Sequence, residues 1–207
     1  MLLDMGPMGE HGIPPGGAWN PHLTGEVRDR ALSAIEAIAE ELREPDFSLY
    51  RLSEADRQGG EASLTIGAAG LAILYAYLDH FRRGFGDAEV GMRFLRQATD
   101  ALEQVPMKPH LFGGYAGIAW SVAHLLSWWI DDEDPLTSID QNLLAQVDVP
   151  HWSGGYDLTD GLVGLGVYAL ERLPRPDAAR CLELIVGHLE ATAVEVAGGL
   201  TWLTQPT

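Results

Sequence analysis

Polar residues that can do chemistry stand at the start of apolar segments in this chain. Asp157 lies in YDLTDGLVGLG (156–166), just before a pair of glycines, and His110 and Ser63 occupy the corresponding places in two similar segments. A carboxylate or an imidazole so placed can act as a general acid or base. Asp157 can equally cap the following helix, with Asp160 at the position of a capping-box acid. The residues alone leave both roles open.

Aromatic residues near these positions are candidates for contacts with a substrate. Tyr156 directly precedes Asp157, and Trp202 lies in a loop-like segment that can border the same opening. If the apolar helices all begin at one rim, His110 faces that opening as well, either as a substrate contact or as a half-exposed structural residue. We therefore predict Asp157 as the catalytic residue and Tyr156, His110 and Trp202 as substrate-binding residues.

The elements that must position these residues form a repeat of 47 residues. SLTIGAAGLA begins at Ser63, HLFGGYAGIA at His110 and DLTDGLVGLG at Asp157, without a gap between the steps. Four columns agree in all three copies, and a fixed period of this length indicates a repeat architecture. They are Leu64, Leu111 and Leu158; Gly67, Gly114 and Gly161; Gly70, Gly117 and Gly164; and Leu71, Ile118 and Leu165. Glycine costs about 1 kcal/mol in a helix relative to alanine, so its recurrence predicts close approach of a neighbouring backbone.

Each copy continues as an apolar helix, typical of an inner layer, and one-sided helices lie between the copies. We predict these outer helices over residues 24–43, 87–105, 136–147 and 177–197. No strand is required. The sequence therefore predicts an all-α fold, an α/α toroid of inner and outer helices of which about half is present, as three helical hairpins plus one helix. Residues 1–23, rich in glycine and proline, are predicted to be a flexible lead-in to a domain over 24–207.

Composition restricts the partners and the metal sites of the chain. Thirteen basic and 30 acidic residues give a net charge of −17, which disfavours binding to nucleic acid or anionic membranes. Residues 111–130 carry no formal charge, but their glycines and serines favour a buried helix over a membrane span. Cys181 is the sole cysteine, which fits a cytoplasmic location. Its spacing from His124 and His188 matches no known zinc motif, so we assign no metal ligand.

The repeated segments SLTIGAAG and LFGGYAGIA, and above all GGYDLTDGLVGLGVYAL, resemble the lanthionine synthetase C-like family over residues 24–207. The resemblance implies a zinc-dependent cyclase of lanthipeptide biosynthesis. Such an enzyme adds cysteine thiols of a precursor peptide to dehydrated Ser or Thr residues and thereby forms thioether rings. It also implies that Asp157, the acid of the Tyr-Asp-Leu box, lies at the active site for acid–base or positioning work. A dehydratase is an implied partner.

The resemblance covers the N-terminal half of the family pattern. GGLTWLTQP resembles the stretch just before the family's His-Gly motif, and the family's zinc ligands, two Cys and one His, come later. Zinc is therefore expected for the complete enzyme and not for this chain alone. Either the remaining half belongs to a longer product, or an oligomer partner supplies it, or the chain is a non-catalytic remnant of the family.

Two other functions remain open from the residues. The concave surface of a helical array can bind a peptide without transforming it. An α/α-barrel glycoside hydrolase would use Asp157 as general acid or base with a second carboxylate opposite, and exposed tryptophans would suit a sugar site. Bound zinc, sugar turnover or neither would discriminate among the three readings.

Overall fold

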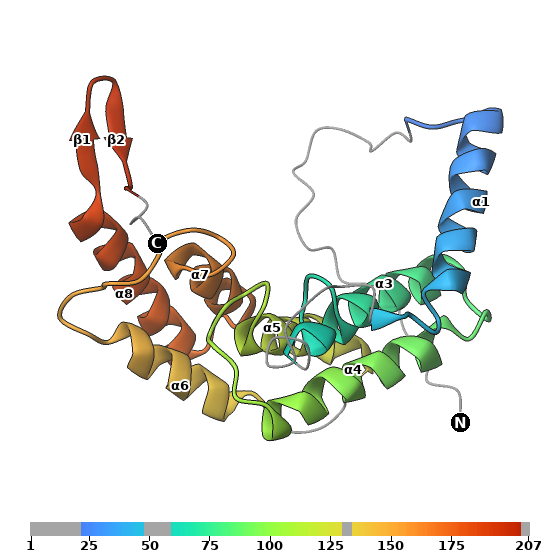
Figure 1. The fold of residues 1–207 in the computed structure, drawn as a ribbon, viewed down its shortest axis with the longest axis horizontal. Helices are drawn as coiled ribbons and strands as arrows, with labels where there is room; N and C mark the ends of the chain where they lie inside the picture. Colours follow the sequence, from blue (N-terminus) through green and yellow to red (C-terminus); the bar gives the residue numbers. More distant parts are fainter. Residues whose placement is uncertain (1–21, 48–58, 130–133, 204–207) are drawn as a thin grey trace. The chain divides into compact units, whose positions relative to one another are not determined.

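The computed structural model describes residues 22–47, 59–129 and 134–203 of the chain (Figure 1). The chain divides into two compact units, residues 1–41 and residues 42–207. Almost all of the predicted lead-in over 1–23 lies outside the described residues. The first unit contains helix α1 (Gly25–Glu41), which confirms the helix predicted over 24–43.

The second unit is built from helices that alternate between apolar and one-sided character along the chain. After a helical turn over 59–62, its elements are α3 (Ala68–Phe81), α4 (Asp87–Gln104), α5 (Tyr115–Trp129), α6 (Thr137–Val147), α7 (Leu162–Glu171), α8 (Pro176–Thr192), β1 (Val194–Val196) and β2 (Gly199–Thr201). Helices α4, α6 and α8 confirm the predicted outer helices. The starts of α3, α5 and α7 keep the 47-residue step of the sequence.

The apolar helices form an inner row, and the one-sided helices pack against it. Helix α5 contacts both α3 and α7, while α4 packs on α3 and α5, and α8 packs on α6 and α7 (Figure 1). Small residues let the inner helices approach closely, because alanines such as Ala69, Ala72, Ala116 and Ala119 are buried there. The inner and outer layers of an all-α array are therefore present, as the sequence predicts.

A polar ladder joins the three inner helices far from their N-terminal ends. The Tyr77 hydroxyl lies 2.9 Å from His124 Nε2, and His124 Nδ1 lies 3.0 Å from Glu171 Oε1. The Trp120 ring stacks on the imidazole, with 4.9 Å between centroids. Because Tyr77, His124 and Glu171 are 47 residues apart, the inner helices run parallel and in register.

A buried ionic cluster fixes α7 against the segment that carries α6. The Arg172 guanidinium lies 2.6 Å from Asp140 Oδ2 and 2.5 Å from Asp134 Oδ2, and the Tyr168 hydroxyl donates to Asp140 Oδ1 at 2.6 Å. The Arg172 and Asp140 side chains are each 4% exposed. Buried charges are tolerated when they are paired and hydrogen-bonded in this way.

The end of the described chain corrects the sequence prediction. The helix predicted over 177–197 ends at Thr192, and Val194–Val196 pairs with Gly199–Thr201 as an antiparallel hairpin, although no strand was expected. Gly198, with φ of 109°, provides the turn, since a side chain rarely adopts this conformation. The alternation Val-Glu-Val carries the period-two signal of a strand, but it is short and directly follows a helical pattern.

No helix in the described ranges is both long enough and apolar enough to span a membrane. Helix α5, which covers most of the uncharged stretch 111–130, has 15 residues and buries Ile118, Val122 and Leu125 in the core.

Candidate functional site at the inner-helix rim

The loops before the inner helices lie side by side and form a rim. The Thr65 N–H donates to the Phe112 carbonyl at 3.3 Å, and the Phe112 N–H donates to the Thr159 carbonyl at 3.2 Å. The Thr65 hydroxyl adds a bond to the same Phe112 carbonyl at 3.0 Å. Each bond spans one repeat of 47 residues. The three segments that begin at Ser63, His110 and Asp157 are thus hydrogen-bonded into one edge.

Glycine is required where each inner helix emerges from its loop. A Cβ at Gly117 would lie 1.8 Å from the Leu111 carbonyl oxygen, and one at Gly164 would lie 2.4 Å from that of Leu158. The same two atoms would lie 3.0 Å from Leu64 Cβ and Leu111 Cβ, respectively, in the preceding repeat. The predicted close approach is therefore present, but the nearest backbone belongs to the loop of the same repeat. The neighbouring repeat contributes a leucine side chain.

Asp157 holds the turn of its loop and does not cap α7. Its Oδ1 accepts the N–H groups of Thr159 and Asp160 at 2.7 and 3.0 Å. The N-cap of α7 is Gly161, which makes no side-chain cap hydrogen bond. The capping interpretation of the sequence is wrong in position, because an Asx turn four residues upstream uses the carboxylate instead.

The ionisation of Asp157 follows from these bonds. The hydrogen bond from the Thr159 hydroxyl, followed by the Asp160 N–H, holds the pKa of the Asp157 carboxyl below its usual range. The side chain is exposed at the rim, and the hydrogen bonds from Thr159 and Asp160 all reach Oδ1. Asp157 is therefore a carboxylate at neutral pH, and Oδ2 takes no part in these three bonds.

His110 is held beside the Asp157 loop by Asp160. The distance from His110 Nδ1 to Asp160 Oδ1 is 3.2 Å, and the His110 side chain is about one quarter exposed. Since Asp160 also donates its N–H to Asp157, a single residue connects the two predicted site residues. In the sequence, Asp160 occupies the position of a capping-box acid, which gives no indication of this contact. The 47-residue register, which places loop 110–114 beside loop 157–161, was the signal that could have found it.

Tyr156, in the loop before α7, and Trp202, directly after β2, are brought together in the fold. Their ring centroids are 6.2 Å apart, tilted by 38°. The Trp202 indole N–H donates to the Leu189 carbonyl at 2.8 Å, so the ring is fixed to the end of α8. Both side chains are half-buried. The pair forms an aromatic surface next to Asp157, and its role in substrate contact stays a prediction.

Ser63 differs from its counterparts His110 and Asp157. It is 1% exposed, and its hydroxyl donates to the Gly60 carbonyl at 2.8 Å and accepts the Ile66 N–H at 3.4 Å. Ser63 is therefore buried, and its hydroxyl is used within its own turn.

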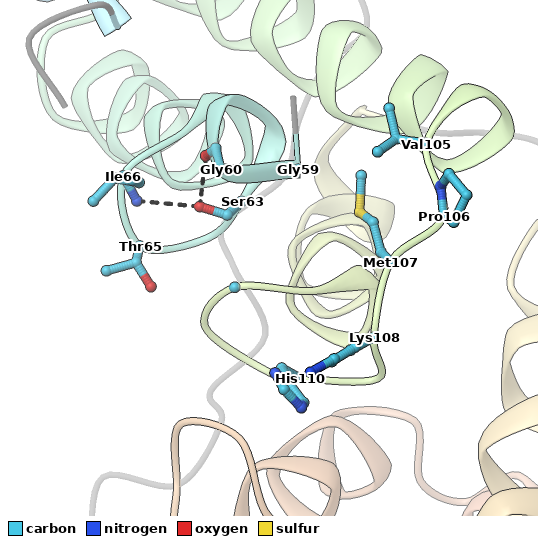
Figure 2. Close-up of a pocket in the computed structure, with 11 residues that line it drawn as sticks. Gly59, Gly60, Ser63, Thr65, Ile66, Val105, Pro106, Met107, Lys108 and His110 are labelled. Carbon is cyan, nitrogen blue, oxygen red and sulfur yellow. Dashed lines mark hydrogen bonds between the residues drawn. The ribbon is translucent and has the colours of Figure 1, made fainter. Parts of the chain in front are cut away.

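A pocket of about 440 Å³ lies at the rim between the first two loops. Figure 2 shows the segment that carries Val105, Met107 and Lys108 running past the loop of Ser63 and Thr65. His110 lines the pocket and also contacts Asp160, so the pocket adjoins the Asp157 loop.

The described residues do not fit a zinc site. Within the described ranges, no group of three or more His, Cys, Asp or Glu side chains is placed to hold a metal ion. Cys181 is buried on α8, and His188 Nε2 lies 2.7 Å from the Val147 carbonyl. His124 is engaged in the inner-helix ladder.

Alternating inner and outer helices, with the inner ones starting at a common rim, define an α/α toroid-type protein. Residues 59–200, more than half of the chain, match the family model described as lanthionine synthetase C-like protein. The chain belongs to this family, as the resemblance implied. No curated protein matches the chain significantly.

Proposed function

We propose that this chain is part of a peptide cyclase that adds cysteine thiols to dehydrated Ser or Thr residues of a precursor peptide. The observation that carries the proposal is the rim, in a chain of the lanthionine synthetase C-like family. Its hydrogen-bonded loops gather a carboxylate, an imidazole and an aromatic pair at one edge. Zinc remains expected for the complete enzyme, and the steps below are those of the described residues only.

In this reaction the sulfur bonds to the β-carbon, the double bond opens toward the α-carbon, and the α-carbon takes up a proton. The proton that the thiol loses equals the proton that the α-carbon gains, so the addition has no net release of protons. Asp157, ionised at neutral pH, orients an N–H group of the substrate or of a protonated side chain. His110, whose Nδ1 lies 3.2 Å from Asp160 Oδ1, places an imidazole beside the Asp157 loop, where it can give or take a proton. Tyr156 and Trp202 would hold the peptide beside these groups.

The test is cyclisation of a dehydrated precursor peptide by the full gene product and by its Asp157→Asn variant. Each ring consumes one thiol, so mass spectrometry after alkylation of the remaining thiols counts the rings. We expect Asp157→Asn to lower turnover by about 100-fold or more, since acid–base and positioning groups contribute on this scale. Asp157→Ser keeps an acceptor for the turn and should be equally impaired. Near-normal turnover in both variants would mean that Asp157 only stabilises the turn of its loop and has no role in catalysis.

The same experiment separates the alternatives. Peptide binding by the wild type without ring formation would indicate a binding module, and hydrolysis of a glycan would indicate a glycosidase. Either result would overturn the proposal that the protein is a cyclase. A cytoplasmic location and a dehydratase partner belong to this proposal, and copurification with a dehydratase would test the latter.

A further inference from the structure

The rim pocket has an apolar wall and a cationic end. Side chains of Ile66, Val105, Pro106 and Met107 line it, and Lys108 and His110 complete it (Figure 2). Its volume of about 440 Å³ is within the range of pockets that hold small ligands. A ligand that fits both ends carries an apolar group next to an anion.

Lys108 is the one lysine of a chain with 30 acidic residues. Its side chain is exposed and forms no ion pair with the described residues. By contrast, Arg43, Arg82 and Arg172 each pair with a carboxylate. An ammonium group at a pocket, with no acidic partner of its own among the described residues, offers its charge to a ligand.

The segment that presents Lys108 is held in place before a ligand arrives. Pro106 and Pro109 fix the backbone φ on both sides of it. The Lys108 carbonyl accepts the Tyr115 N–H at 3.0 Å, and the His110 carbonyl accepts the Gly117 N–H at 3.3 Å. Little ordering is therefore required of the protein on binding, which favours affinity.

Glycines keep the pocket open. A Cβ at Gly113 would meet no atom within 4 Å, and one at Gly59 would meet only Met107 Cγ, at 4.0 Å. Both glycines line the pocket. A side chain introduced at Gly113 would therefore enter space without a clash.

We propose that this pocket binds a segment of the peptide substrate in which an apolar side chain stands next to an acidic one. The apolar side chain lies against Ile66, Val105 and Met107, and the carboxylate binds Lys108, with His110 beside it. The inference rests on the proposed function in that the ligand is a peptide. It adds a sequence preference, and it places the bound segment next to the Asp157 loop.

The first test uses Lys108 as its own reporter. The full chain is acetylated with an amine-reactive ester in the presence of a capped ten-residue peptide of Gly and Ser with a central Leu-Glu pair. Mass spectrometry follows the modification of Lys108 and, as an internal control, of the N-terminal amine. We expect acetylation of Lys108 to slow at least threefold at saturating peptide while the N-terminus is unchanged. The isosteric Leu-Gln peptide should protect much less.

Equal effects of the Leu-Glu and Leu-Gln peptides, or no protection by either, would overturn the proposal. Protection of Lys108 that rises with protein concentration in the absence of peptide would mean that a second copy of the chain occupies the pocket. That result would overturn it as well.

Variants supply the second test, with dissociation constants of the Leu-Glu peptide measured by titration of the methionine methyl NMR signals. Lys108→Glu should weaken binding about tenfold or more, and Lys108→Arg should retain it, because hydrogen bonds to charged groups are the strong ones. Gly113→Leu should abolish binding by filling the pocket. Gly187→Leu is the matched control, since a Cβ there also meets nothing within 4 Å but lies on α8.

Unchanged affinity in Lys108→Glu and Gly113→Leu would refute the pocket even if Gly113→Leu proved unstable, because the Lys108 variants report independently. Failure of the two proposals is distinguishable. Ring formation that persists with unchanged peptide affinity in both variants would leave the cyclase intact and remove the pocket. Absence of ring formation by the wild type would overturn the proposed cyclase. Binding of the Leu-Glu peptide would still test the pocket.

Discussion

The ionised state of Asp157 determines which step it can serve. Three groups donate to one of its oxygens, and the hydrogen bond from the Thr159 hydroxyl is the largest cause that keeps its pKa low. A carboxylate so stabilised is a poor proton donor at neutral pH. In the proposed cyclase, this geometry favours orientation of a donor by Asp157 and leaves proton transfer to another group such as His110.

This assignment predicts the pH profile of ring formation. Asp157 is deprotonated at any pH above the usual range of an aspartate, so it should add no acid limb between about pH 5 and 8. Asp157→Asn should lower the whole profile and leave its shape unchanged, because the Asp157 carboxylate is already ionised across this range. The measurement is kcat/KM against pH for the wild type and the variant. Disappearance of a neutral limb in Asp157→Asn would contradict the assignment.

Cys181 is a structural residue despite being the sole thiol. It is 3% exposed, and its burial, with a smaller effect of the Asp140 charge, raises the pKa of the thiol to about 11. Reactive cysteines are exposed thiolates, and Cys181 meets neither condition.

We therefore expect the native chain to resist iodoacetamide at pH 8, with one equivalent taken up only after unfolding in urea. Intact-mass spectrometry follows the modification. Rapid labelling of the native chain would show that α8 opens easily or that Cys181 is accessible.

Two helical glycines differ in the space around them, and this difference determines how their helices tolerate a side chain. At Gly117, on the inner helix α5, a Cβ would overlap the Leu111 carbonyl oxygen and press on Leu64. At Gly187, on the outer helix α8, a Cβ would meet open space. The same substitution should therefore have opposite effects on the two helices.

Gly117→Ala should lower the free energy of unfolding by about 1–3 kcal/mol, because the backbone must shift to relieve the overlap. Gly187→Ala should raise it by up to about 1 kcal/mol, through helix propensity alone. Urea unfolding of the two variants beside the wild type measures both. A tolerated Gly117→Ala would mean that the rim loops adjust freely.

At the scale of the whole molecule, the free energy of unfolding should depend on pH through the ionic cluster of Arg172, Asp140 and Asp134. Burial raises the pKa of Asp134, but hydrogen bonds from Arg172 and the Leu136 N–H, with the charges of Arg172 and Arg175, outweigh it and lower the pKa. A carboxyl whose folded pKa is depressed contributes its stabilisation above its unfolded pKa of about 4 and loses it as the pH falls through the folded value.

Asp134→Asn should accordingly be less stable than the wild type at pH 7, and the difference should shrink as the pH falls below about 4. Urea unfolding at pH 7, 5, 4 and 3 provides the comparison. Removal of the exposed pair Arg180–Glu183 by Arg180→Met is the control, with an expected change within about 0.5 kcal/mol at every pH. A difference for Asp134→Asn that stays constant with pH would exclude the linkage.

The helices and the family of this protein could be predicted from its sequence because their signals are local and repeated. Apolar spacing marks each helix, and the recurring glycines mark where each inner helix begins, after Gly67, Gly114 and Gly161. The hairpin after α8 was missed because Val-Glu-Val followed by two glycines is too short to outweigh the helical pattern before it.

The contacts of the site were decided only by the tertiary structure. The pairing of His110 with Asp160 and of Tyr156 with Trp202 depends on which loops lie side by side, and the hydrogen bonds between the loops settle that order. Likewise, Asp157 could have capped a helix or held a turn, since both need only a backbone N–H within reach. The sequence determined which residues stand at the rim, and the register between neighbouring repeats determined which of them meet.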